Sequence, residues 1–242
     1  MNFYTSINRY GNTLLYRGLS QDGKRVLKKI PFSPTLFIPS KDKNTEWKGI
    51  DGVPVSPMKF NNMREAGNFV KRYEGVEGFK IYGNTNYIVQ YITEKWPNEI
   101  EWDRNKINVT TIDIEVASDE GFPFPNEANQ EVIAITTKNN IDHKFYVWGL
   151  NPYDSKNKNG VVYKQCSSEK ELLLDFLNFW SHPDNCPDVV TGWNIRFFDI
   201  PYLVNRMNKI VGTDQCRKFS PWGVINKDSV VIKNKDQEHF MI

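Results

Sequence analysis

Two carboxylates at alternating positions of an apolar run are the residues best suited to chemistry in this chain. Residues 111–116 read TIDIEV, with Asp113 and Glu115 on either side of Ile114. Alternate side chains of a β-strand point to opposite faces, so both carboxylates should project together while the isoleucines face a core. Two anionic groups on one face cost free energy unless they are neutralised, and divalent cations bind such oxygen ligands well. The alternative interpretation is an amphipathic strand whose acidic face is simply solvated.

A third carboxylate, Asp199, lies about eighty residues later in the run NIRFFDIPYL, where a predicted strand end passes into a predicted helix. The carboxyl end of a strand is a favoured place for a site in open α/β sheets. Aspartate is also a good helix N-cap, with Pro201 suited to the first helical turn. The N-cap role alone would account for Asp199, although an N-cap can also be a metal ligand.

The elements that would position these carboxylates follow an α/β pattern. Three β-branched or apolar runs precede a helix, a short fourth strand and a second helix. The first three strands need no crossover, which favours an antiparallel meander. A capping box formed by Ser168 and Glu171 marks the start of the first helix, and Gly212 marks the stop of the second. The predicted strands are 109–116, 131–137, 144–150 and 187–192, and the predicted helices are 168–181 and 199–211.

The first hundred residues follow a different, mixed β/α pattern. Turn residues separate three strand-like runs, and a proline- and lysine-rich stretch comes next. A helix with one apolar stripe, a further apolar run and a polar linker follow. These segments are, in order, 2–7, 13–18, 25–31, 34–57, 63–73, 87–93 and 94–106. We therefore expect a smaller domain over residues 1–106 and a larger one over 107–242.

The composition excludes several classes of protein. With 39% apolar and 14% aromatic residues, the chain can bury a core and is not a disordered segment. Its three cysteines show neither a zinc spacing nor a disulfide framework, which is typical of reduced thiols. The sequence contains no apolar run of membrane-spanning length and no signal-peptide core. The net charge of +2 neither requires nor excludes a nucleic-acid partner. The sequence predicts a cytoplasmic protein with no membrane partner.

Taken together, the two carboxylate motifs resemble the first two exonuclease motifs of the family B DNA polymerases. Asp-Ile-Glu on a strand is followed about eighty residues later by Asn194-x-x-x-Phe198-Asp199 at the start of a helix. Matches lie between and beyond the motifs, and together they resemble the polymerases of T-even-like bacteriophages. These matches are Gly121-Phe122-Pro123, Thr191-Gly192-Trp193, Pro201-Tyr202, Asn205-Arg206 and Lys218-Phe219-Ser220-Pro221. The likeness is specific from about residue 100 onward and weaker before it.

The resemblance implies an RNase H-like fold with a mixed sheet that cleaves DNA 3′→5′ with two divalent metal ions, Mg²⁺ or Mn²⁺. By that resemblance Asp113 bridges both ions, Glu115 holds the ion that activates water, and Asp199 holds the second ion largely through water. Hard oxygen ligands suit these metals. The implied partners are single-stranded DNA, primer–template DNA and the C-terminal polymerase portion, with RNA as a further candidate.

Four residues are candidates for substrate binding. Asn194 and Phe198 match the rest of the second motif and should shape the pocket for the 3′-terminal nucleotide. Phe122 is a candidate for packing against a frayed base, because an aromatic face accepts any base; a loop aromatic that covers the core is the alternative. We expect a hairpin formed by residues 221–225 and 229–233, in which Lys227 would suit a phosphate contact.

A third motif, Tyr-x-x-x-Asp, belongs to the family pattern and does not occur after Asp199. We therefore expect little or no exonuclease activity and no polymerase activity from this polypeptide alone, and an unpaired sheet edge at residues 189–191. The chain would be a cut piece of a longer polymerase or one half of a split one. Two other functions stay open: a module that binds template strand or mRNA without catalysis, and an independent nuclease completed by Asp214 or Asp228.

Overall fold

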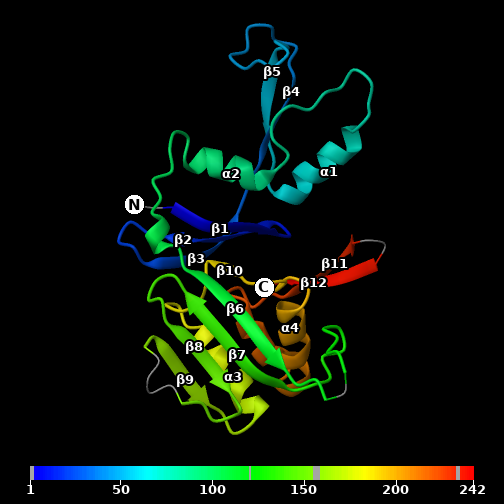
Figure 1. Cartoon of the computed structure of the whole chain (residues 1–242). Coiled ribbons are helices and arrows are strands. Elements are labelled where there is room, and N and C mark those ends of the chain that lie inside the picture. The colour runs from blue at the N-terminus through cyan, green and yellow to red at the C-terminus, as the bar shows by residue number, and fades with distance from the viewer. Residues whose placement is uncertain (1–2, 120, 155–158, 233–234) are drawn as a thin grey trace. The chain divides into compact units, whose positions relative to one another are not determined.

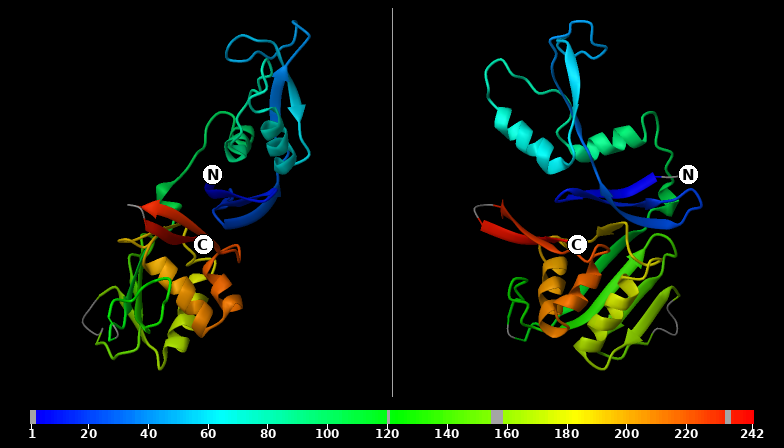
Figure 2. Two further views of the ribbon diagram at one scale, coloured as in Figure 1. Left: turned by 90° about the vertical axis from the view of Figure 1, so that its right-hand side faces the viewer. Right: turned by 180° about the vertical axis from the view of Figure 1, so that it is seen from behind.

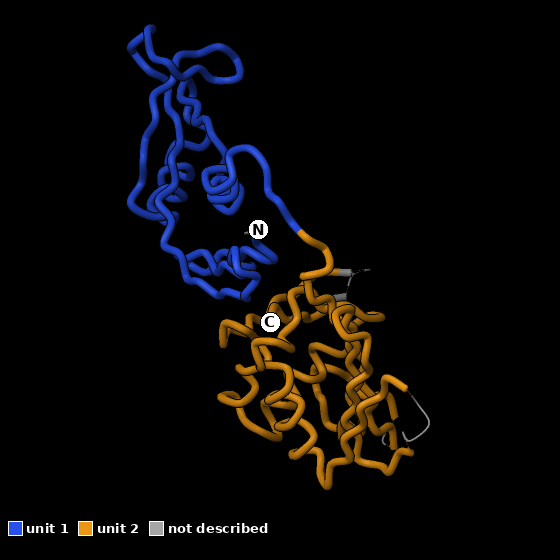
Figure 3. The backbone as a smooth tube through the Cα atoms, turned by 90° about the vertical axis from the view of Figure 1, so that its left-hand side faces the viewer, with its two compact units in different colours: residues 1–102 blue, residues 103–242 orange. Residues whose placement is uncertain are grey.

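The computed structural model describes residues 3–119, 121–154, 159–232 and 235–242. The chain divides into two compact units, Met1–Trp102 and Asp103–Ile242, coloured blue and orange in Figure 3. This division lies four residues before the boundary expected at residue 106, and the domain boundary itself stays a prediction. Each unit has its own buried core.

The three strand-like runs predicted at the start of the first unit form an antiparallel three-stranded meander (Figure 1). The strands β1 (Phe3–Tyr10), β2 (Thr13–Leu19) and β3 (Arg25–Pro31) pair in chain order. Gly11 has a φ of +60°, which glycine adopts without steric cost, so the chain can turn tightly between β1 and β2. Tyr16 and Leu14 of β2 are almost fully buried in the core of this unit.

Two strands that were not expected from the sequence begin within the proline- and lysine-rich stretch 34–57. β4 (Thr35–Pro39) and β5 (Val55–Lys59) form an antiparallel two-stranded ladder in which Phe37 lies opposite Pro57. Proline lacks the N–H that a central strand needs, but a two-stranded ladder consists only of edge strands and tolerates it. Because of these prolines, the two segments do not show the residue pattern typical of strands.

Two helices complete the first unit. α1 (Met63–Tyr73) has the predicted bounds, and its N-cap Asn62 accepts a hydrogen bond from the Glu65 N–H at 2.9 Å. The apolar run after residue 87 is α2 (Tyr87–Lys95), so the first two residues of the expected linker are helical. Asn86 caps α2 by accepting from the next helical N–H groups, which is the start signal that the pattern analysis missed.

The second unit contains a mixed five-stranded sheet in the order β10-β6-β7-β8-β9. The short helical turn η1 (Arg104–Lys106) leads into it. The predicted meander is confirmed, because β6–β7 and β7–β8 are antiparallel. The outer pairs, β8–β9 and β10–β6, are parallel. The strands are β6 (Val109–Val116), β7 (Val132–Asn139), β8 (Phe145–Gly149), β9 (Val161–Gln165) and β10 (Val189–Thr191). β9 was not predicted, because its five residues are mostly exposed and give no clear apolar face.

The helices α3 (Glu169–Trp180) and α4 (Asp199–Ile210) lie on the same face of this sheet (Figure 2). They share one core with the inward-facing residues of β6, β7 and β8. Two short turns, α5 (Thr213–Cys216) and η2 (Arg217–Phe219), follow Gly212, whose φ of +85° suits the predicted helix stop. The capping box is only half formed: Ser168 accepts from the Glu171 N–H, but the Glu171 carboxylate accepts from the Ser167 N–H.

A hairpin follows, later in the chain than predicted. Its strands are β11 (Asn226–Ile232) and β12 (Lys235–Met241), and residues 221–225 form no strand. Lys227 and Asp228, expected between the two strands, lie within β11. Residue 233, expected to end the second strand, lies outside the described residues. In the part of the chain that the structure describes, no helix is long and apolar enough to cross a membrane.

Candidate active site

The alternation of β6 places its two carboxylates on the face of the sheet that the helices leave open. Ile112 and Ile114 are buried in the core beneath α3 and α4, while Asp113 and Glu115 are exposed. The cross-strand neighbours of the two carboxylates on β7 are Thr136 and Ala134, which carry no charge. The sheet therefore presents two adjacent anionic side chains on an open face.

The edge of β6 brings the third carboxylate to the same place. β10 pairs with β6 only as far as Thr191, opposite Thr111. Beyond that point the Ile114 N–H donates a hydrogen bond of 3.1 Å to Asp199 Oδ1, between the two exposed carboxylates. A Cβ on Gly192 would lie 2.6 Å from the Ile112 carbonyl oxygen, so only glycine lets the chain turn this closely over β6.

Asp199 is not the N-cap of α4, which corrects the N-cap interpretation. The cap residue is Phe198, and it makes no side-chain capping bond. Asp199 is the first residue of the helix, only 3% exposed, with its carboxylate turned toward β6. This buried carboxylate accepts a backbone hydrogen bond at the edge of β6 and interacts electrostatically with Asp113 and Glu115.

Burial raises the pKa of the Asp199 carboxyl to about 6, and the negative charges of Asp113 and Glu115 push it in the same direction. The N–H groups of Asp199 and Ile114 lower it in part. The site thus gathers negative charge that favours a cation, and its oxygen donors are those that hard divalent ions prefer. Among the described residues, however, no three His, Cys, Asp or Glu side chains converge as a ligand set. The donors suit a divalent ion in chemical type but do not enclose one.

Aromatic side chains lie close to the first residue of α4. Phe122 and Phe124 are 66% and 56% exposed, with ring centroids 5.3 Å apart. The Phe122 ring also lies 6.0 Å from that of Phe198, which is half-buried and lies 5.8 Å from the Tyr202 ring. We call Phe122, Phe124 and Phe198 the aromatic surface. Phe124 was not singled out from the sequence, although its position two residues after Phe122 places both on one exposed loop.

The turn into α4 holds the remaining residues of the second motif. Asn194 is exposed with a φ of +55°, and its carbonyl accepts from the N–H groups of Phe197 and Phe198, each at 3.0 Å. Asparagine tolerates this left-handed conformation better than most residues. Trp193 beside it is 92% exposed, and the sequence analysis assigned it no role.

The hairpin contacts this turn, but Lys227 is engaged elsewhere. Arg196 Nη2 lies 3.1 Å from His239 Nε2 of β12, and the Phe197 and His239 rings are 6.4 Å apart. Lys227 Nζ is 2.6 Å from the Glu238 carboxylate. The structure therefore brings the hairpin to the turn without presenting Lys227 as an unpaired cation.

The two carboxylates considered for a fourth ligand have other contacts. Asp214 lies 3.6 Å from Arg217, and Asp228 Oδ1 accepts from the Ser229 N–H at 2.8 Å. Neither is among the groups that influence Asp199. The described residues thus group Asp199 with Asp113 and Glu115 only.

Comparison with known proteins agrees with this geometry. The family profile described as DNA polymerase family B, exonuclease domain, matches residues 79–242. The DNA-directed DNA polymerase of Escherichia phage RB69 is 31% identical over 90% of this chain and 27% of its own length. That of Enterobacteria phage T4 is 32% identical over 96% of this chain and 28% of its own length. The DNA polymerase delta catalytic subunit of Dictyostelium discoideum is 33% identical over 42% of this chain.

The chain spans slightly more than a quarter of the length of the two phage polymerases that it matches. Its matched region contains both carboxylate motifs and the whole five-stranded sheet. An independent nuclease unrelated to polymerases is therefore the wrong interpretation. The chain belongs to the family B DNA polymerases and contains their exonuclease domain.

Proposed function

We propose that this chain supplies the 3′→5′ proofreading exonuclease of a phage replicative DNA polymerase, which removes mispaired nucleotides from primer ends by hydrolysing the phosphodiester bond. The observation that carries the proposal is the hydrogen bond from the Ile114 N–H to Asp199. It joins two motifs 85 residues apart and holds a buried carboxylate at the backbone of Ile114, the residue between Asp113 and Glu115 in the chain.

The proposed cofactors are Mg²⁺ or Mn²⁺, bound as two ions. When bound, such ions stabilise the charge on the attacking and leaving oxygens of an in-line displacement. We propose Asp113 and Glu115 as the direct ligands, because both are exposed on the open face. Asp199 would act largely through water, a role that fits its burial and the lack of a convergent three-residue ligand set in the described residues.

The chain's own residues would bind and orient the DNA end. Phe122 and Phe198 offer ring faces for stacking on an unpaired base of any identity. Asn194 shapes the turn that carries Phe198. Lys227 can contact a phosphate only by giving up its ion pair with Glu238, so we propose a minor role for it.

The proposed partners are single-stranded DNA, primer–template DNA and the polymerase portion of the same enzyme, and the proposed place of action is the host cytoplasm. A nucleic-acid-binding module without catalysis is not favoured by any observation. RNA binding by the first unit likewise has no observation in its favour.

The test is degradation of a 5′-labelled single-stranded oligonucleotide with Mg²⁺ or Mn²⁺. It is run on the chain alone and on a polypeptide in which a polymerase portion follows the chain. We expect the longer polypeptide to shorten the oligonucleotide from its 3′ end. Asp113→Ala should abolish this activity, and Asp214→Ala, the matched control, should retain it. Equal activity in both variants would refute the assignment of the carboxylates.

A further inference from the structure

A buried ion pair joins the two helices beneath the sheet. Arg206 of α4 and Glu169 of α3 form two parallel hydrogen bonds, Nε to Oε1 at 2.7 Å and Nη2 to Oε2 at 2.8 Å. Their side chains are only 12% and 6% exposed. Glu169 Oε1 also accepts from the N–H of Val132, the first residue of β7, at 2.8 Å. The pair thus fixes the point at which the β6–β7 loop enters β7.

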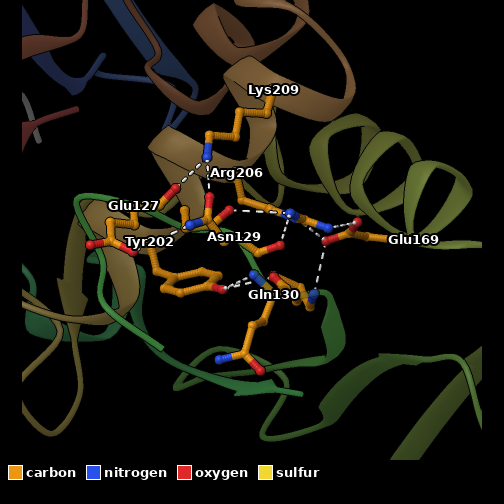
Figure 4. A network of polar contacts seen from close by, with 9 residues as sticks. Glu127, Asn129, Gln130, Glu169, Tyr202, Arg206 and Lys209 are labelled. Atoms are coloured by element: carbon orange, nitrogen blue, oxygen red, sulfur yellow. Dashed lines mark hydrogen bonds and ion pairs between the residues drawn. The ribbon is translucent and has the colours of Figure 1, made fainter. Parts of the chain in front are cut away.

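The same face of α4 holds the backbone of that loop (Figure 4). Arg206 Nη1 donates to the Ala128 and Asn129 carbonyl oxygens at 3.1 and 2.7 Å. Tyr202 Oη accepts from the Gln130 N–H at 3.1 Å and donates to the Gln130 carbonyl at 2.7 Å. Asn205 and Lys209 add bonds to the Pro125 carbonyl and the Asn129 side chain, at 2.9 and 2.7 Å.

These bonds stabilise a backbone conformation that the loop would not adopt by itself. Ala128 is fully buried and has a φ of +41°, a value unfavourable for a residue with a Cβ. Such conformations persist only where the surroundings determine them, and they occur often at functional sites. Arg206 supplies that determination, because its guanidinium holds the carbonyl oxygen of Ala128 itself.

One connection between this part of the loop and the aromatic surface runs through the side chain of Gln130. Gln130, whose backbone Tyr202 holds, donates from Nε2 to the Gly121 carbonyl at 2.9 Å. Gly121 directly precedes Phe122, and Gly121 itself has a φ of +92°. The ion pair is thus connected to Phe122 through Gln130.

We propose that Arg206, paired with Glu169, is a positioning residue that orders residues 121–131 and so sets the place of Phe122 beside the DNA end. The inference rests on the proposed function for its consequence, but the ordering of the loop can be measured without DNA.

The test is hydrogen–deuterium exchange of the chain with Arg206→Gln, beside Arg217→Gln as the matched control. Arg217 is an exposed arginine that pairs with Asp214. We expect amide exchange in residues 121–131 to rise at least about tenfold more in Arg206→Gln than exchange in β6 and β10, whose rise reports only the loss of overall stability. Unchanged exchange in the loop would overturn the proposal, as would an equal rise throughout the unit, which a merely structural role predicts.

Two further variants keep the test decisive if Arg206→Gln unfolds. Gln130→Ala removes the side-chain bond to Gly121 and leaves the ion pair intact, so faster exchange should be confined to the part of the loop around Phe122. Arg206→Lys keeps the charge but not the two-bond fork and should restore the order of the loop only in part. Unchanged exchange around Phe122 in Gln130→Ala would overturn the link to the aromatic surface.

A second readout uses single-stranded DNA with 2-aminopurine at its 3′ end. Phe122→Ala and Arg206→Gln should each change the fluorescence of the 2-aminopurine in the bound DNA. The double variant should give the same fluorescence as Phe122→Ala alone, because both changes remove the same contact. Additive changes would contradict the proposal. Failure of the unsubstituted chain to bind this DNA would count against the proposed function, whereas the exchange result would still decide the role of Arg206.

Discussion

Two buried carboxylates in the second unit have opposite surroundings. Glu169 is 5% exposed and faces the fork of Arg206, with a further backbone N–H as donor. Asp199 is 3% exposed and faces the negative charges of Asp113 and Glu115, with no cationic side chain among the described groups that shift its pKa. The first carboxylate is neutralised by the fold, while the second is left to be neutralised from outside.

The difference separates structure from function within one domain. A buried charge with a matched partner holds elements together, here α3, α4 and the β6–β7 loop. A buried charge beside like charges destabilises the fold unless something binds there, and such groups are typical of functional sites. Removing the cation that pairs with Glu169 should therefore lower the stability of the protein. Neutralising Asp199 should raise the stability and weaken its dependence on divalent cations.

The largest expected effect is on the neutralised carboxylate. Arg206→Gln should lower the free energy of unfolding by about 3–5 kcal/mol, because Glu169 stays buried without its cation. Urea denaturation at pH 7.5 measures this loss. The double variant Glu169→Gln/Arg206→Gln should lose less, since no charge is left unpaired. A loss below about 1 kcal/mol in the single variant would show that the pair is not a matched buried pair.

Removing the charge of the other carboxylate should stabilise the protein. The folded pKa of Asp199 is about 6 against an ordinary value of 3.8, so the folded state binds the proton more tightly than the unfolded state does. The contribution to stability is fully present below pH 3.8 and is lost as the pH rises through about 6. Asp199→Asn should therefore be more stable than the unsubstituted chain by about 2–3 kcal/mol at pH 7.5 without divalent ions.

That gain should disappear below about pH 4, where the aspartate is itself neutral. Denaturation curves at the two pH values, both with a chelator, make the comparison. Addition of Mn²⁺ at pH 7.5 should stabilise the unsubstituted chain more than Asp199→Asn. Lower stability of Asp199→Asn at pH 7.5 would mean that the acidic surroundings do not dominate.

A smaller effect is expected for the aromatic surface. Phe122→Ala should weaken the binding of single-stranded DNA by about 1–2 kcal/mol, because one stacking face is lost. The free energy of unfolding should hardly change, since the side chain is 66% exposed. Fluorescence anisotropy measures the affinity, and Phe145→Ala, which removes a partly exposed ring on β8, is the matched control. Equal losses in the two variants would argue against a specific role.

The smallest effect is expected for Lys227. Its ion pair with Glu238 is partly exposed, so Lys227→Ala should cost less than about 1 kcal/mol of stability. If the side chain makes a phosphate contact, the slope of log affinity against log salt should fall by about 1. An unchanged slope would remove Lys227 from the DNA contacts and leave the comparison of the two carboxylates intact.

The strand and the two helices that position the site could be predicted from the sequence, because local residue patterns determine them. The alternation around Asp113 and Glu115 gave β6 and its exposed face, and the apolar stripes gave α3 and α4. β4, β5 and β9 were missed because prolines or exposed side chains mask the alternation in short edge strands. The hairpin was misplaced because its turn is set by the pairing of β11 with β12, which local patterns do not reveal.

The contacts that define the site could not be predicted, since they join segments that are far apart in the sequence. Asp199 bonds Ile114 beyond the last β10–β6 pair, and the N-cap interpretation failed because Phe198 is the cap residue. Arg206 and Glu169 matched helix patterns and gave no signal of their pairing. Motif resemblance supplied the grouping of Asp199 with Asp113 and Glu115, which no local rule could have provided.

The most direct test of the comparison is calorimetric titration of the chain with Mn²⁺ at pH 7.5. The unsubstituted chain, Asp113→Ala and Asp228→Ala are compared, the last as a control on an aspartate outside the site. We expect Mn²⁺ binding that is lost in Asp113→Ala and kept in Asp228→Ala. Equal binding by all three proteins would contradict it, because the uncompensated carboxylates of β6 and α4 would then not be a cation site.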